Sequence, residues 1–220
     1  MALPRPPRAV IFDMDGLLVD TETVVFRAMN RASAPLGRDM PMPVFQRMVG
    51  LTHAHSDAIV LEHYGADFDL AAWNAEVSAH FRAELTTVGI PLKAGAPELL
   101  DHLDELDLPR AIATSSNLAS VRASLGPHGL VDRFHALITR DVQTQGKPHP
   151  EPFLKAAAAL GVDPADCLAL EDSHNGVRAA AAAGMMTVMV PDMLHPTDEM
   201  HSLCVRIAID LHEVRQWLPR

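Results

Sequence analysis

The amino-acid sequence predicts an α/β protein, a doubly wound parallel sheet with an inserted four-helix cap domain. Two observations indicate this class. Short apolar runs without sustained alternation, as expected of strands buried on both faces, are separated by helical patterns. Between residues 20 and 86 the alternation stops and the pattern is helical throughout. We therefore predict a discontinuous α/β core, residues 1–19 and 87–220, and a helical cap domain over residues 20–86.

The core segments follow one another as strand and helix. In "LGVDPADC", Gly161 is expected to end a helix and Pro164 to turn the chain before the next strand. Strands in this alternation are joined by right-handed crossovers, and such sheets bind ligands at the carboxyl ends of the strands. The predicted strands are 8–12, 110–114, 136–139, 167–171 and 186–190, with a sixth edge strand at 205–209, and the predicted helices are about 95–107, 117–125, 150–161, 173–183 and 211–218.

The helical interval is predicted to form a module of its own. The chain returns from it through "GIPLKAGAP", residues 89–97, whose two prolines and two glycines suit a stiff hinge. A module inserted directly after the first strand can cover the strand ends as a lid. Its predicted helices are roughly 20–33, 41–49, 54–64 and 70–86.

Composition narrows the class of protein. The chain has 220 residues, of which 48% are hydrophobic and 21% charged, which suits a soluble globular protein. Its longest apolar runs are too short for a membrane helix or a secretory signal, so we expect a cytoplasmic protein. The net charge of −10 argues against nucleic acid or an anionic membrane as partner. Cys167 and Cys204, each on a strand-like run, are expected to be buried free thiols.

Polar residues gather where the predicted strands end. A doubly wound sheet brings these strand ends to one edge, where several carboxylates would repel one another unless a cation compensates. Oxygen ligands of this kind favour Mg²⁺, and a lysine with hydroxyl groups suits a phosphoryl group. The residues are Asp13 and Asp15 after the first strand, Thr114 and Ser115 after the second, Lys147 in the loop after the third, and Glu171 and Asp172 after the fourth.

The first pair has a spacing that suits covalent catalysis. Residues two apart on a strand point the same way, so Asp13 and Asp15 can share one site while Met14 is buried between them. One carboxylate can attack phosphorus while the other handles a proton, which divides hydrolysis into two steps through an aspartyl-phosphate. The spacing leaves open which of the two attacks. Gly16 then permits a tight turn.

Four segments carry a resemblance to a known family. "DMDGLLVDTE", "ATSSN", "GKPHPEPF" and "LALEDSHNGVRAAAAAGM" resemble the four ordered motifs of the haloacid dehalogenase superfamily. They are most similar to its β-phosphoglucomutase-like branch of sugar phosphatases and mutases. The resemblance covers residues 8 to about 191, and it implies a Rossmann-like core with a helical cap.

The resemblance also implies roles for single residues. Asp13 would be the phosphoryl-accepting nucleophile, and Asp15 the general acid and base, with its backbone carbonyl on the metal. Asp172 would be the second magnesium carboxylate, and Glu171 an additional carboxylate of the metal shell, either contacting the ion or lying behind its ligands. Lys147 would neutralise the charge of the phosphoryl group and the nucleophile. Thr114 or Ser115 would bind that group, with Asn117 close by and Gly16 in the turn beside it.

Residues of the predicted cap domain distinguish a phosphatase from a mutase. In the mutases of that branch a histidine lies ten residues after the acid/base aspartate, and here that position is Val25. A second cap signature is present as "VGLTHAHS", with Gly50 in place but His53 where a permanent cation is often found. A histidine is mostly uncharged at neutral pH unless an anion raises its pKa. Glu22 is a candidate for binding a sugar hydroxyl. The candidate substrate cations of the cap are Arg27, Arg31 and Arg47, for which a solvated surface charge is the alternative.

The sequence thus predicts a magnesium-dependent phosphatase that acts on a small phosphomonoester, in particular a sugar phosphate. The alternatives are a phosphosugar mutase of the β-phosphoglucomutase type and a non-catalytic metabolite-binding protein on the same fold. A dehalogenase proper has no use for magnesium and lacks the second aspartate, so Asp15 counts against it. We expect a monomer, because the cap must open and close.

Overall fold

The computed structural model describes residues 3–51, 53–87 and 89–219. The chain divides into two compact units. One comprises Met1–Val19 and Pro91–Arg220, and the other comprises Asp20–Ile90. Among the described helices, none is long and apolar enough to cross a membrane.

The first unit is built on one parallel sheet of six strands in the order β3-β2-β1-β4-β5-β6. The central strand β1 pairs with β2 on one side and with β4 on the other, so its carboxyl end lies at the switch point where the strand order reverses. All six predicted strands are confirmed. They are β1 Ala9–Phe12, β2 Arg110–Ala113, β3 Ala136–Ile138, β4 Cys167–Glu171, β5 Met186–Met189 and β6 Arg206–Ile207.

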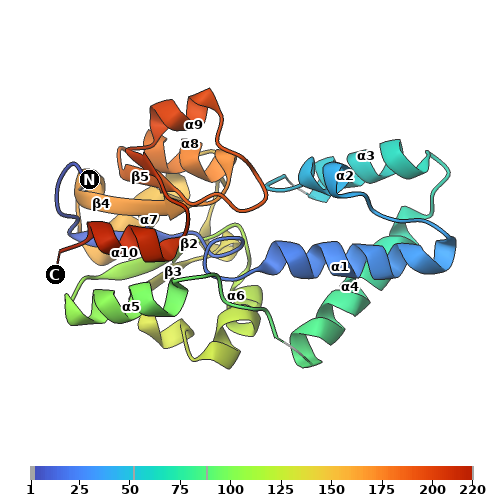
Figure 1. Ribbon diagram of the computed structural model, residues 1–220, viewed down its shortest axis with the longest axis horizontal. Coiled ribbons are helices and arrows are strands. Elements are labelled where there is room, and N and C mark those ends of the chain that lie inside the picture. The colour runs from blue at the N-terminus through green and yellow to red at the C-terminus, as the bar shows by residue number, and fades with distance from the viewer. Residues whose placement is uncertain (1–2, 52, 88, 220) are drawn as a thin grey trace. The chain divides into compact units, whose positions relative to one another are not determined.

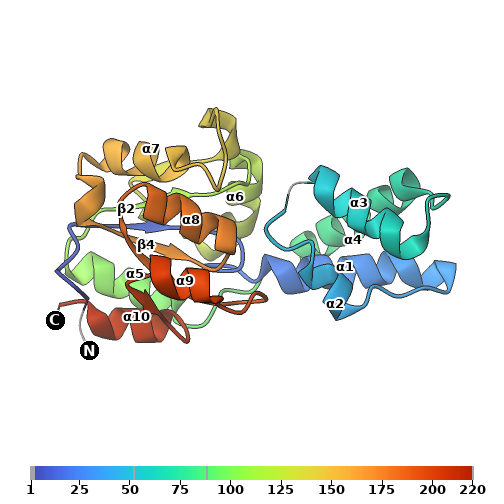
Figure 2. The same cartoon turned by 90° about the horizontal axis from the view of Figure 1, so that it is seen from above.

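Helices cover both faces of this sheet (Figure 2). On one face, small side chains of α7 and α8, among them Ala156 and Ala179, pack with Ile11 in a fully buried cluster. Because these contacts use alanines, the two helices approach the strands closely. On the opposite face α5 packs against α10. The helices of this unit are α5 Ala96–Glu105, α6 Leu118–Leu125, α7 Glu151–Leu160, α8 His174–Ala182, α9 Asp198–Leu203 and α10 Leu211–Trp217.

The structure differs from the sequence-based expectation at two places in this unit. Helix α9 was not predicted, because it is only six residues long and lies in a polar segment. The signal that identifies it is Thr197, whose side chain accepts a hydrogen bond from the Met200 amide and caps the helix. Cys204 therefore follows a helix rather than lying on a strand. The edge strand β6 is also shorter than predicted, since Ile209 at the end of its apolar run is 86% exposed.

The described residues of the second unit form four α-helices, as predicted. Helix α1 packs against α4, which crosses it obliquely (Figure 1). The indole nitrogen of Trp73 donates to the Ser33 hydroxyl at 3.0 Å and ties the two helices together. Helix α2 is shorter than the predicted 41–49. After Gln46 the backbone amides donate to the carbonyl three residues earlier, as in a 3₁₀ turn, rather than to the carbonyl four residues earlier. The helices are α1 Thr21–Ser33, α2 Met42–Gln46, α3 His53–Tyr64 and α4 Leu70–Thr87.

Candidate active site

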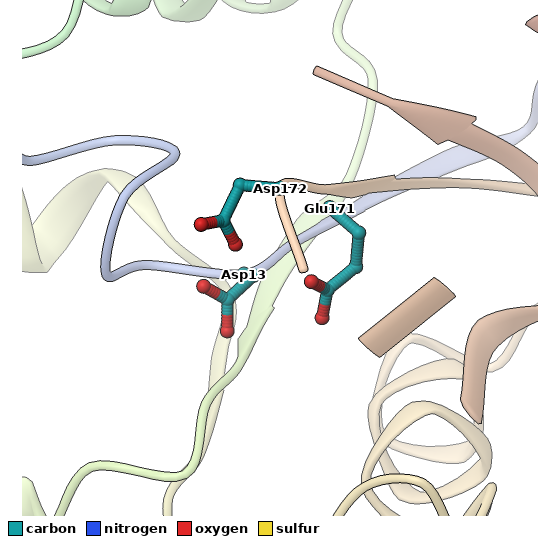
Figure 3. A group of neighbouring side chains, drawn as sticks. All are labelled: Asp13, Glu171 and Asp172. Atoms are coloured by element: carbon teal, nitrogen blue, oxygen red, sulfur yellow. The ribbon is translucent and has the colours of Figure 1, made fainter. Parts of the chain in front are cut away.

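Asp13 lies at the carboxyl end of the central strand. Its backbone amide donates to the Leu170 carbonyl at 3.0 Å, which ties the end of β1 to β4. The side chains of Asp13, Glu171 and Asp172 converge from these two strands (Figure 3). One carboxylate oxygen of each lies within 4.8 Å of the others, and all three residues are buried. We call these three residues the acidic cluster.

Lys147 reaches the acidic cluster from the loop between β3 and α7. Its ammonium nitrogen lies 2.5 Å from Asp13 Oδ1 and 2.5 Å from Glu171 Oε1. Burial by itself lowers the pKa of this lysine, but the two carboxylates outweigh burial and raise its pKa above the ordinary value. Lys147 is therefore a permanent cation that is held between the two acids.

Glu171 is completely buried at the end of β4. Besides Lys147, it accepts hydrogen bonds at Oε2 from the Ser173 hydroxyl at 3.1 Å and the Ser173 amide at 3.4 Å. Burial raises the pKa of Glu171, and the nearby Lys147 counteracts this shift. A Cβ on Gly176 would lie 1.9 Å from the Glu171 carboxyl carbon, so only glycine fits at that position of α8. Both oxygens of Glu171 are thus engaged by the protein.

The loop after β1 passes close to Asp172. Gly16 has φ +79°, and its amide donates to the Val19 carbonyl at 2.9 Å in the predicted tight turn. A Cβ at this position would lie 2.2 Å from Asp172 Oδ2. Gly16 is therefore required both for the turn and for the close approach of Asp172.

Asp15 is held by the loop after β2, while Met14 is buried between the two aspartates. Asp15 Oδ2 accepts hydrogen bonds from the Ser116 hydroxyl at 2.8 Å and from the Thr114 hydroxyl at 3.4 Å. The Ser116 amide in turn donates to the Thr114 hydroxyl at 3.0 Å. Sequence reasoning missed Ser116. The feature that could have identified it is its position as the third hydroxyl residue of "ATSSN".

Two other predicted residues of this unit lie further along the same segment. Ser115 is exposed. Asn117 caps helix α6, and its Oδ1 accepts a hydrogen bond from the Ser120 amide at 2.8 Å. Because the side-chain oxygen of Asn117 is used to cap helix α6, the side-chain NH₂ group of Asn117 is the part suited to an anion.

The predicted cap residues all belong to the second unit. Glu22 lies in the first turn of α1 and is half-buried, and Gly50 has φ +73°. The side chain of His53 lies outside the described part of the structure. The three candidate cations are engaged by carboxylates: Arg27 and Arg31 by Glu84, and Arg47 by Glu62.

The strand order, together with an acidic cluster and a buried lysine at the switch point, defines an enzyme of the Rossmann-like class. The family model of haloacid dehalogenase-like hydrolases matches residues 7–184. The chain belongs to this family.

Proteins from several bacteria resemble the chain over most of its length. Protein CbbY encoded on a plasmid of Cupriavidus necator is 34% identical and aligns with 87% of this chain and 81% of that protein. Hexitol phosphatase B of Escherichia coli K12 is 34% identical, over 87% of this chain and 86% of that protein. The crystal structure of CbbY from Rhodobacter sphaeroides in complex with phosphate matches with a TM-score of 0.76 at 25% identity, over 94% of this chain and 96% of that chain.

Proposed function

We propose that this protein is a magnesium-dependent phosphatase that hydrolyses a small phosphomonoester, in particular a sugar phosphate, through an aspartyl-phosphate on Asp13. One observation carries the proposal: Asp13 ends the central strand, is contacted by Lys147 at 2.5 Å, and lies beside two further buried carboxylates. A buried carboxylate next to a fixed ammonium group can accept a phosphoryl group whose charge that lysine neutralises.

The acidic cluster fits a divalent cation. Its three carboxylates face one ammonium group, which leaves surplus negative charge in a buried place. Carboxylate oxygens are the donors that Mg²⁺ prefers. Because both oxygens of Glu171 are engaged, Asp13 and Asp172 would hold the ion together with the Asp15 carbonyl, and Glu171 would orient Lys147. Bound magnesium would neutralise charge that develops on the phosphoryl oxygens.

The reaction would proceed in two steps on the residues of this chain. In the first, Asp13 attacks phosphorus in line while Asp15 protonates the leaving alkoxide. In the second, Asp15 accepts a proton from the water that hydrolyses the aspartyl-phosphate. The hydrogen bonds from Ser116 and Thr114 would keep the Asp15 carboxyl in place for both proton transfers.

The proposed substrate class is supported by the relatives. Hexitol phosphatase B is a phosphatase by name, and the CbbY structure contains phosphate. Val25 supports hydrolysis over phosphoryl transfer between sugars, because the mutases of the branch have a histidine there. Selectivity would come from the cap unit, for which Glu22, Gly50 and His53 remain candidates together with Ser115 and Asn117 of the core.

The test is initial-rate phosphate release from p-nitrophenyl phosphate and a panel of sugar phosphates, with magnesium or with chelator. We expect release by the wild type that requires magnesium and is abolished in Asp13→Asn, while Asp198→Asn, which changes an exposed aspartate, retains the full rate. Retention of a few per cent of activity by Asp13→Asn would refute the nucleophile. No release from any substrate by folded wild type would favour the mutase or the binding protein.

A further inference from the structure

A fourth carboxylate, that of Asp192, lies near the acidic cluster on the loop after β5. This loop is tied to the end of β4, because the Val190 amide donates to the Glu171 carbonyl at 2.7 Å. Asp192 Oδ1 forms an ion pair with the Lys93 ammonium group at 2.6 Å. The Asp192 side chain is only 14% exposed, so this is a mostly buried ion pair.

The second oxygen of this carboxylate lacks a partner. Asp192 Oδ2 is buried and accepts no hydrogen bond from any described residue. A buried carboxylate oxygen without a donor costs free energy, and native proteins rarely leave one unsatisfied. The ion pair with Lys93 provides a partner for only one of the two carboxylate oxygens. The other half is suited to a donor that the polypeptide itself does not supply.

Gly16 shows where this oxygen lies. A Cβ placed on Gly16 would lie 3.5 Å from Asp192 Oδ2 and 2.2 Å from Asp172 Oδ2. The two carboxylates thus approach the same side of one glycine, and no Gly16 side chain separates them. Unless a cation or its waters lay between them, two anions this close would repel each other.

We propose that Asp192 is a positioning residue for the magnesium site, and that its Oδ2 accepts a hydrogen bond from a water molecule carried by the ion. Mg²⁺ binds through few carboxylates and keeps several waters, which are strong donors. Lys93 engages only Oδ1 of this carboxylate, so Oδ2 stays available for the contact. The inference rests on the proposed function, since it requires the ion at Asp13 and Asp172. Neither Lys93 nor Asp192 belongs to the four motifs.

The test is the dissociation constant of Mg²⁺, measured by isothermal titration calorimetry on wild type, Asp192→Asn and Asp198→Asn. Asparagine keeps the shape of the side chain but removes its charge. Mutation of a residue that hydrogen-bonds to a metal ligand typically lowers metal affinity about 10-fold or more. We therefore expect about 10-fold weaker magnesium binding in Asp192→Asn and no such loss in Asp198→Asn. A dissociation constant of Asp192→Asn within about twofold of wild type would overturn the inference.

A second variant separates metal binding from simple structural support. Lys93→Met removes the cation beside Asp192, so we expect magnesium binding as tight as in wild type or tighter. A purely structural ion pair would weaken binding equally in both variants, and that result would also overturn the inference. Circular dichroism in chelator verifies that each variant is folded. Absence of magnesium binding by wild type would instead contradict the proposed function.

Discussion

Each unit of this protein contains an ion triad with a buried central residue, and the two triads are of opposite sign. In the core, Lys147 lies between Asp13 and Glu171 at 2.5 Å from each. In the cap unit, Glu84 lies between two arginines, 2.5 Å from Arg27 and 3.0 Å from Arg31. The central residue is 6% exposed in both triads. One triad therefore has surplus negative charge and the other surplus positive charge.

The surroundings of the outer residues explain what the two triads do. Arg27 and Arg31 are 42% and 55% exposed, so water screens the surplus charge of the cap triad. That triad joins α1 to α4. In the core, Asp13 and Glu171 are buried, and Asp172 adds a further carboxylate. Because water is largely excluded there, the surplus charge favours a bound cation.

The largest effect is expected from removing the central cation of the core triad. Lys147→Met leaves two buried carboxylates facing each other, and breaking a buried ion pair typically costs about 3 kcal/mol or more. We expect that loss in the free energy of unfolding, measured with urea in chelator, and partial recovery with magnesium. Phosphate release should fall by about a thousandfold.

Lys155→Met is the matched control, because Lys155 pairs with Glu151 at the surface of α7. Because Lys155 is 40% exposed and also donates to the Val142 carbonyl at 2.6 Å, we expect unchanged phosphate release and a loss of stability much smaller than in Lys147→Met. If Lys147→Met were no less stable than this control, the core triad would not be the charge-unbalanced site described above.

The next effect concerns the acid that lies outside the core triad. In Asp15→Asn the proton donor to the leaving group is lost, and general acid catalysis contributes about a hundredfold or more. We expect that loss with a sugar phosphate, whose alkoxide leaves poorly, and a much smaller loss with p-nitrophenyl phosphate. Ser116→Ala removes the 2.8 Å hydrogen bond to Asp15. Its loss of activity should depend on the leaving group in the same way but should be smaller than that of Asp15→Asn. Equal losses of Asp15→Asn on both substrates would remove its acid role.

Much of the core triad could be predicted from the sequence, because its residues follow strands. The apolar runs fix where β1 and β4 end, and parallel strands bring these ends to one edge, which places Asp13 beside Glu171 and Asp172. Lys147 was predicted at this edge because its loop follows the third strand, and its role came from the resemblance. No periodicity predicts where a loop residue between β3 and α7 will point.

The rest could not be predicted, because it depends on packing between segments distant in sequence. Lys93 and Asp192 are separated by 99 positions, and nothing in their local sequence pairs them. The same holds for Glu84, which lies 53 positions from Arg31. Arg27 and Arg31 were named from the sequence as candidate substrate cations, with solvated surface charges as the alternative. The structure instead pairs both with a buried carboxylate.

The smallest effect is expected from the cap triad. Glu84→Gln removes the charge that two arginines share, but because both arginines are partly exposed we expect a loss of only about 1–2 kcal/mol in unfolding free energy. Trp73 is buried in this unit and Trp217 belongs to the core, so urea unfolding followed by fluorescence in a Trp217→Phe background reports the cap unit. Glu62→Gln, which affects only the exposed pair with Arg47, should leave the midpoint unchanged. If it lowered the midpoint as much as Glu84→Gln, burial would not distinguish the cap triad from an ordinary surface pair.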